Sequence, residues 1–287
     1  MQPPRLRTVP GIAPTGRYAE CFIDPEGLDI GLGAVSDGGL LASFVEFCLP
    51  GPGVAVVEVG AGTGLLTFEG GLAAAIGPRG ELVATDPVAA LLRLFVQKRA
   101  REGAGQVRVL RAAAEALPVA DAQADLVCGS RFLQYCDVPR ALAEMVRVTR
   151  PGGTVAVLAV LQPVVGPGWL DVLRPLRAAT RRAGRIVGAG LPHCSGAVAS
   201  AFTAAGLCRV ETQRRMQRAD FPDYATCVRL LTQLSCLEAL LVGLAAGEAE
   251  AALHQAYSDV RTMFGLRPPE QRRLLLRYEF VRGRVPD

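Results

Sequence analysis

The strongest constraint on this chain is an apolar run that ends in a glycine-rich turn, Val56-Val57-Glu58-Val59-Gly60-Ala61-Gly62-Thr63-Gly64. The run predicts a buried strand that leads through the turn into a helix. Glycines let the backbone approach a ligand without Cβ clashes, and they point amide groups at it. The third glycine follows the second by two residues, whereas the dinucleotide motif G-x-G-x-x-G requires three. The turn therefore predicts a nucleotide-like cofactor but does not specify which one.

Apolar runs and helical segments alternate along most of the chain. Strands are expected over 54–59, 81–85, 107–111, 124–129, 154–160, 207–217 and 274–282, and helices over 40–48, 65–76, 88–102, 138–149, 196–205 and much of 222–268. Such alternation is typical of parallel sheets whose two faces are covered by helices. We therefore expect a doubly wound α/β fold.

Three polar or glycine-containing sites follow expected strands, and we expect them to converge in space. In doubly wound sheets, ligands bind beyond the carboxyl ends of the strands. The turn Gly60–Gly64, Asp86 and the pair Gly129-Ser130 all occupy such ends. A carboxylate at Asp86 can accept two hydrogen bonds from a ribose diol. A tight turn without a ligand and a solvated Asp86 are the alternatives that these residues alone leave open.

Composition excludes several other classes of protein. The 287 residues carry a net charge of +4, which is too mild to indicate a nucleic-acid partner. None of the eight cysteines forms a C-x-x-C pair, so no metal site is expected, and a reduced, cytoplasmic compartment fits best. The uncharged stretch 151–170 is interrupted by glycines and prolines, so we expect two loops around a strand rather than a membrane span.

Three downstream segments carry a family resemblance. They are Glu115-Ala116-Leu117-Pro118, Ala124-Asp125-Leu126-Val127, and Ala141-Leu142-Ala143-Glu144-Met145-Val146-Arg147-Val148-Thr149-Arg150-Pro151-Gly152-Gly153. Their order resembles the class I S-adenosylmethionine-dependent methyltransferases, in the small-molecule branch typified by ubiquinone and menaquinone biosynthesis. The resemblance is strong over 50–160 and weak over 204–210 and the last strand. It implies a Rossmann-like, seven-stranded, mostly parallel sheet with an antiparallel last strand and a helical lid.

The resemblance also implies roles for individual residues in binding the cofactor. The amino-acid end of S-adenosylmethionine would be held by Glu58 and by the turn residues Gly60, Ala61, Gly62 and Gly64. Asp86 would bind the ribose hydroxyls, and Pro87 would pack near the adenine. Ala114 and Glu115 would flank the adenine edge, and Gly129 and Ser130 would line the path to the sulfonium.

Two positions depart from the family pattern. Ala113 stands where the family often has an aspartate that accepts from the adenine amino group. The sequence Leu133-Gln134-Tyr135 replaces the common L-H-W, so a histidine base is missing there. Gln134 is then expected to position a substrate, and Tyr135 to line the pocket.

Few other residues are candidates for a general base. His193 is the first candidate, and its alternative is a loop histidine without a role. His254 is expected to be an exposed helix residue. Tyr18 and Asp24 belong to an N-terminal segment that commonly closes over the cofactor in this family, although a structural role is the more frequent one.

We expect one methyltransferase domain over 1–287. Its parts are an N-terminal cap (1–49), a cofactor-binding core (50–160), two lid insertions (161–192 and 222–268) and the remaining core (196–217 and 274–283). Five arginines between 174 and 185 face either solvent or an acidic substrate. The leucines between 230 and 241 are expected to form a lid core or a dimer face, so a monomer and a homodimer both remain open.

The implied reaction is methyl transfer to a small organic acceptor, a secondary metabolite or a quinone-like ring, with S-adenosylhomocysteine as the other product. An enzyme that uses the cofactor for a non-methylating step, such as cyclisation, is an alternative because the base is missing. An RNA methyltransferase is a second alternative, opposed by the mild charge and the absence of an Asn-Pro-Pro-Tyr-like signature. The intact glycines and Asp86 argue against a non-catalytic binding protein.

Overall fold

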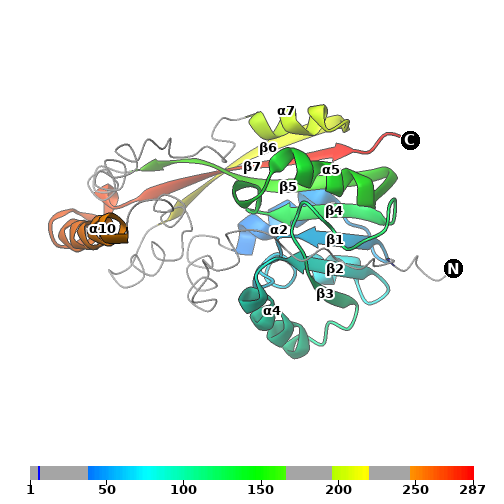
Figure 1. Ribbon diagram of the computed structural model, residues 1–287, viewed down its shortest axis with the longest axis horizontal. Helices are drawn as coiled ribbons and strands as arrows, with labels where there is room; N and C mark the ends of the chain where they lie inside the picture. The colour runs from blue at the N-terminus through cyan, green and yellow to red at the C-terminus, as the bar shows by residue number, and fades with distance from the viewer. Residues whose placement is uncertain (1–5, 7–37, 166–195, 220–245) are drawn as a thin grey trace.

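The computed structural model describes residue 6 and residues 38–165, 196–219 and 246–287. Within these ranges, seven strands form one sheet in the order β3-β2-β1-β4-β5-β7-β6 (Figure 1). Strands β1 to β5 are parallel, and β7 runs antiparallel to both β5 and β6. The strands are β1 Ala55–Val59, β2 Glu81–Asp86, β3 Val107–Arg111, β4 Ala124–Ser130, β5 Thr149–Val165, β6 Cys208–Ala219 and β7 Leu274–Arg284. The doubly wound, mostly parallel sheet predicted from the sequence is confirmed.

Helices cover both faces of this sheet. They are α2 Gly38–Cys48, α3 Leu72–Ile76, α4 Ala89–Arg101, α5 Val138–Val148, α7 Ala197–Ala204 and α10 Ala246–Leu266, with 3₁₀ turns η2 Leu133–Tyr135 and η3 Pro269–Gln271. Helices α5 and α7 share one hydrophobic core with the sheet, and α2 and α3 share the core on the other face. On that second face, Phe44 of α2 contacts Phe280 of β7 edge-on, with ring centroids 5.3 Å apart.

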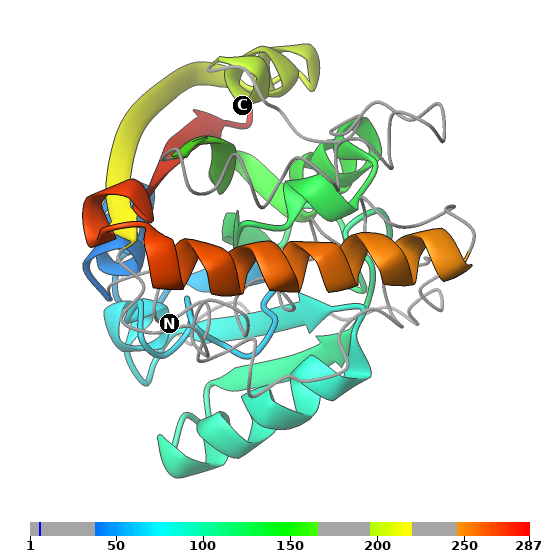
Figure 2. The same ribbon diagram turned by 90° about the vertical axis from the view of Figure 1, so that its left-hand side faces the viewer.

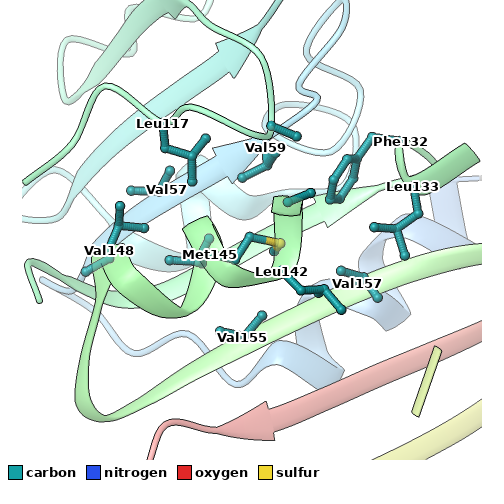
Figure 3. Close-up of a cluster of buried hydrophobic side chains, with 14 of the residues drawn as sticks. Val57, Val59, Leu117, Phe132, Leu133, Leu142, Met145, Val148, Val155 and Val157 are labelled. Atoms are coloured by element: carbon teal, nitrogen blue, oxygen red, sulfur yellow. The ribbon is translucent and has the colours of Figure 1, made fainter. Parts of the chain in front are cut away.

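Helix α5 shows why the sequence specifies these layers. The Asp137 side chain accepts a hydrogen bond from Arg140 N at 3.1 Å, and a proline in the first turn fixes the entry of the chain. Four apolar side chains recur at helical spacing and are fully buried: Ala141, Leu142, Met145 and Val148. They pack on the valines of β1 and β5 (Figure 3).

The predicted helix over 65–76 is wrong in its first half. Residues 65–70 form consecutive turns, and the α-helix covers only Leu72–Ile76. Gly71 precedes this helix with φ +79°, a left-handed conformation that interrupts a continuous α-helix. The apolar residues of both halves still face the core, which is why their spacing suggested a single helix.

Strands β5, β6 and β7 continue beyond the rest of the sheet as a three-stranded ribbon (Figure 1). Ser130 at the end of β4 pairs with Leu158, yet β5 stays paired with β7 as far as Val165 and Leu274. Because β5 is parallel to β4, the ribbon extends past the carboxyl ends of the parallel strands. Helix α10 is connected to this ribbon through η3 and crosses in front of the sheet in the view from that side (Figure 2).

The two predicted lid segments are described only in part. Residues 161–165 belong to strand β5, and 246–266 form helix α10, while 166–192 and 222–245 lie outside the described residues. No helix in the described ranges combines the length and apolar character needed to cross a bilayer.

Candidate cofactor site

The glycine turn after β1 has one side packed and one side open. Gly60, Gly62 and Gly64 have φ values of +67°, +57° and +90°. A Cβ on Gly60 would lie 2.5 Å from Phe132 Cβ, and one on Gly64 would lie 2.8 Å from the Phe68 ring. At Gly62 a Cβ would meet no heavy atom within 4 Å. The turn therefore needs Gly60 and Gly64 for packing, and it leaves open space beside Gly62.

Asp86 connects this turn to the end of β2. Its side chain is 6% exposed, with Oδ2 accepting from Gly62 N at 2.9 Å and Oδ1 accepting from Val88 N at 2.8 Å. Ala61 N also donates to Thr85 O at 2.9 Å. The amides of Ala61 and Gly62 are thus satisfied within the protein, so they hold the turn in place and do not point at a ligand as the sequence suggested.

The Asp86 carboxylate keeps capacity for a ligand. Each oxygen accepts one backbone hydrogen bond and has a further lone pair, which is what the two hydroxyls of a ribose require. Burial raises the pKa of Asp86 to about 6, although the bonds from Val88 and Gly62 act in the opposite direction. The carboxylate is therefore mostly ionised at neutral pH and is held in one orientation.

Glu58 is enclosed by the protein. It is 1% exposed, and its Oε2 accepts a hydrogen bond from the Thr67 hydroxyl. Burial raises the pKa of Glu58 to about 8, and the nearby Asp86 adds to this rise. Glu58 thus carries its proton at neutral pH and lies beneath the turn. Direct contact between Glu58 and a cofactor stays a prediction.

The end of β4 lies beside the glycine turn, because Gly129 pairs with Val59. A Cβ on Gly129 would lie 2.4 Å from Val59 O and 2.6 Å from the Phe132 ring, so only glycine fits there. The next side chain, Ser130, has a buried hydroxyl with no hydrogen-bond partner in the described part of the chain. An orphaned buried hydroxyl at this edge fits a site that a ligand completes.

The family segments after β3 and on α5 are linked by one polar network. Glu144 Oε2 accepts from Leu117 N at 2.9 Å, and Arg147 donates to Leu117 O at 3.1 Å and Val119 O at 3.0 Å. Arg147 also pairs with Glu144 and Asp121, each at 2.6 Å. The network fixes the loop after β3 on α5, and this explains why the two segments occur together.

The other predicted site residues are placed as follows. Ala114 is buried at 8% exposure in the core. Glu115 Oε1 accepts from Asp137 N at 2.8 Å, so this carboxylate positions the start of α5. Gln134 and Tyr135 form η2, directly after β4, and are half-buried. Pro87 follows Asp86 and accepts a hydrogen bond from Arg111 at 2.9 Å.

Several predicted residues cannot be placed. Tyr18, Asp24, His193 and the arginines of 174–185 lie outside the described residues. His254 is on α10 and is exposed, as expected. Across the described ranges, no group of three His, Cys, Asp or Glu side chains is arranged to hold a metal ion.

Two residues at this edge were not predicted. Arg131 follows Ser130 with φ +58°, and its N donates to Leu158 O at 2.8 Å. Burial lowers the pKa of Arg131, and its interaction with the Tyr278 side chain, which accepts a hydrogen bond from it, partly offsets this. Tyr278 comes from β7 and pairs with Val160, two positions past the level of Ser130. Arg131 and Tyr278 are far apart in the sequence, and no local pattern predicts their contact. The position of Arg131 directly after a predicted strand is the one signal that could have marked it as a site residue.

The strand order, the glycine turn and the buried acid at the end of β2 form a Rossmann-like sheet with the features expected of an S-adenosylmethionine-dependent methyltransferase. Residues 56–153 match the family described as the methyltransferase domain. This segment, about a third of the chain, therefore matches a methyltransferase domain, and the resemblance inferred from the sequence is confirmed.

Curated relatives support the same family. The chain is 39% identical over 106 residues to a malonyl-[acyl-carrier protein] O-methyltransferase of Methylococcus capsulatus, covering 37% of each chain. It is 35% identical over 114 residues to the ubiquinone/menaquinone biosynthesis C-methyltransferase UbiE of Pasteurella multocida, covering 39% of this chain and 42% of that one. The matches thus span about two fifths of the relatives' lengths.

Solved structures share the fold. A phosphoethanolamine N-methyltransferase 2 of Haemonchus contortus, in complex with S-adenosylhomocysteine, is similar with a TM-score of 0.57 and 11% identity, over 94% of this chain and 60% of that one. The [4+2]-cyclase SpnF is similar with a TM-score of 0.55 and 18% identity, over 98% of this chain and 99% of that one. At these identities the likeness concerns the fold alone.

Proposed function

We propose that this protein transfers a methyl group from S-adenosylmethionine to a small organic molecule, at the carboxyl edge of the sheet. The observation that carries the proposal is the Asp86 carboxylate, held by Gly62 N at 2.9 Å next to the open side of that glycine. This arrangement supplies a fixed double acceptor for a ribose and clear space beside it. The methyltransferase-domain match over 56–153 supports the choice of cofactor.

The chain's own residues have three tasks in such a reaction. Asp86 binds and orients the ribose, and the buried Ser130 hydroxyl offers a donor and an acceptor to whatever lies next to β4. The half-buried side chains of Gln134 and Tyr135 help to exclude water from the bound ligands. When bound, S-adenosylmethionine supplies an electrophilic methyl group on a sulfonium. Because the sulfonium charge is lost during displacement, alignment of the acceptor and exclusion of water provide most of the catalysis.

For the acceptor we propose a secondary metabolite or a quinone-like ring, bound between η2 and the ribbon. Gln134 positions the acceptor, and Tyr135 lines its pocket. Arg131 and Tyr278 add a cation and a phenol near this place. The names of the relatives, one an O-methyltransferase and one a C-methyltransferase, are compatible with an oxygen or a carbon nucleophile. His193 is the proposed base.

A non-methylating step such as cyclisation is the second candidate. The chain shares its fold over nearly the whole length with a [4+2]-cyclase, and this fold alone does not distinguish cyclisation from methyl transfer. The absence of a histidine base at the position of Gln134 keeps this candidate open. The two candidates differ in the mass of their products.

Three measurements test the proposal. Calorimetry with S-adenosylmethionine, S-adenosylhomocysteine and NAD is expected to show binding of the first two only; NAD binding without the others would overturn it. Incubation of candidate acceptors with methyl-labelled cofactor is then expected to give a product that has gained one labelled methyl group. An isomer of unchanged mass would support cyclisation, and label found only in added RNA would support the RNA alternative. Turnover that survives His193→Ala would remove His193 as a base.

A further inference from the structure

A pocket lies at the opposite edge of the sheet from Asp86. It has a volume of about 190 Å³ and is lined by the end of α2, the first residues of β4, β5 and β6, and the last residues of β7. Because β4 and β5 run parallel, their first residues lie at the amino edge. The pocket is therefore separate from the cofactor site.

Four arginines line this pocket together with two acids: Arg150, Arg209, Arg282, Arg284, Asp125 and Glu211. Arg150 pairs with Asp125, and Arg282 pairs with Glu211, each at 2.6 Å. Arg282 is further fixed by donating to Phe47 O at 2.7 Å. The remaining two guanidinium groups give the pocket an excess of two positive charges.

The other two arginines, Arg209 and Arg284, have no acidic partner among the described residues and are arranged differently. Arg284 donates to Gly152 O at 2.8 Å, which leaves most of its N–H donors available. Asp287 lies beside Gly152 but does not line the pocket. Arg209 makes no side-chain hydrogen bond or ion pair with the described residues.

Arg209 sits in an irregularity of strand β6. The register between β6 and β7 shifts between Cys208 and Glu211, and Arg209 has φ +49°. Such bulges re-aim a side chain at a local cost in backbone strain. Here the bulge brings Arg209 to the same pocket as Arg284. Thr154, which is 9% exposed, also lines the pocket, and its hydroxyl makes no hydrogen bond with the described residues.

We propose that this pocket binds a phosphate dianion, either free phosphate or the terminal phosphoryl group of a small metabolite. The planar, five-donor guanidinium matches the oxygens of a phosphate, and two uncompensated arginines match its charge. The volume of about 190 Å³ leaves room for a phosphate together with water molecules.

The test uses the full chain and inorganic phosphate as the probe. Calorimetry and thermal unfolding are measured with sodium phosphate and with sodium chloride at equal ionic strength. Phosphate, and not chloride, is expected to bind and to raise the unfolding temperature. Arg209→Gln and Arg284→Gln are each expected to weaken binding about tenfold, the loss of one charge-assisted contact. Arg140→Gln, an exposed arginine of α5, is the matched control and is expected to bind phosphate as the parent does.

Each outcome of these measurements either supports or overturns phosphate binding at this pocket. Equal effects of phosphate and chloride, or phosphate binding that persists in the double variant Arg209→Gln/Arg284→Gln, would overturn the proposal. Glycerol 3-phosphate in place of phosphate distinguishes the two sources, since tighter binding of the ester identifies a phosphoryl group on a metabolite. S-adenosylmethionine affinity is expected to stay unchanged in these variants, which also shows that they are folded.

Discussion

The backbone N–H of Gly62 donates to Asp86 Oδ2 across 2.9 Å, so the glycine turn and the acid on the next strand form one rigid unit. The two residues come from different strand ends, which the parallel pairing of β1 and β2 brings side by side. A ligand that binds Asp86 is therefore held at a fixed position next to the glycine turn.

Asp86→Asn is expected to weaken S-adenosylmethionine binding by about 10- to 100-fold. The substitution removes one acceptor oxygen and the negative charge of the carboxylate. Hydrogen bonds to charged groups contribute about 1.5–3 kcal/mol each. Calorimetry measures the change. The exposed Glu102→Gln serves as the control, and an unchanged affinity in the Asp86 variant would remove Asp86 from the site.

The same substitution is expected to alter the pH dependence of stability. The pKa of Asp86 is raised by burial from 3.8 to about 6, so the folded state binds this proton more tightly than the unfolded state. This contribution to the free energy of unfolding is complete below about pH 4 and is lost as pH rises through about 6. Urea unfolding of the free protein should show this decline in the parent and a smaller one in Asp86→Asn.

Glu58→Gln is expected to change the pH dependence of stability over a wider pH range than Asp86→Asn, and one that extends to higher pH. Burial raises the pKa of Glu58 from 4.5 to about 8, so its contribution to stability is present below about pH 4.5 and lost as pH rises through about 8. The variant should therefore lose less stability than the parent between pH 6 and pH 9. Identical urea unfolding curves for parent and variant over that range would contradict the expectation.

Gly129→Ala is expected to destabilise the protein by about 1–3 kcal/mol, as in other overpacked cores. The new methyl group would lie 2.4 Å from Val59 O, a backbone atom that cannot move aside cheaply. Gly105→Ala is the matched control, because a Cβ there meets nothing within 4 Å. Denaturant unfolding compares the two, and equal free energies of unfolding would show that β1 and β4 separate easily.

Arg147→Leu is expected to cost about 1–3 kcal/mol of stability, because it leaves Glu144 and two carbonyls of the loop after β3 without their donor. Arg140→Leu on the same helix is the control, since Arg140 has an exposed side chain with no ion pair in the described ranges. Chemical unfolding gives both values. A control variant as unstable as Arg147→Leu would show that helix composition, and not the network, is responsible.

The parallel half of the fold was predictable because its signals are local. Strand β1 begins one residue later than predicted, and the Asp137 cap marked the start of α5. Strand β5 was predicted too short, since Pro163 seemed incompatible with a strand. The structure accommodates it where the register with β7 shifts, between Leu161 and Val164, a position where proline is tolerated.

The placement of some candidate site residues was predictable for the same reason, whereas their roles stay predictions. Asp86 and Gly129 follow from their places at strand ends. By contrast, Arg131 meets Tyr278 through the pairing of β5 with β7, and Arg209 reaches its pocket through a bulge. Such contacts depend on tertiary register, which no short stretch of sequence encodes.

The place of β7 between β5 and β6 determines the order in which the protein is completed. Strand β6 precedes β7 in the chain, yet within the described sheet its partner is β7, so it stays an unpaired edge until the last strand is synthesised. Chains emerge N-terminal part first, and pairings between distant segments form slowly. Strands β1 to β5 can therefore pair during synthesis, whereas the three-stranded ribbon connected to α10 forms only after β7 has been made. A chain that stops before Leu274 would hold a formed glycine turn with an exposed sheet edge at β5.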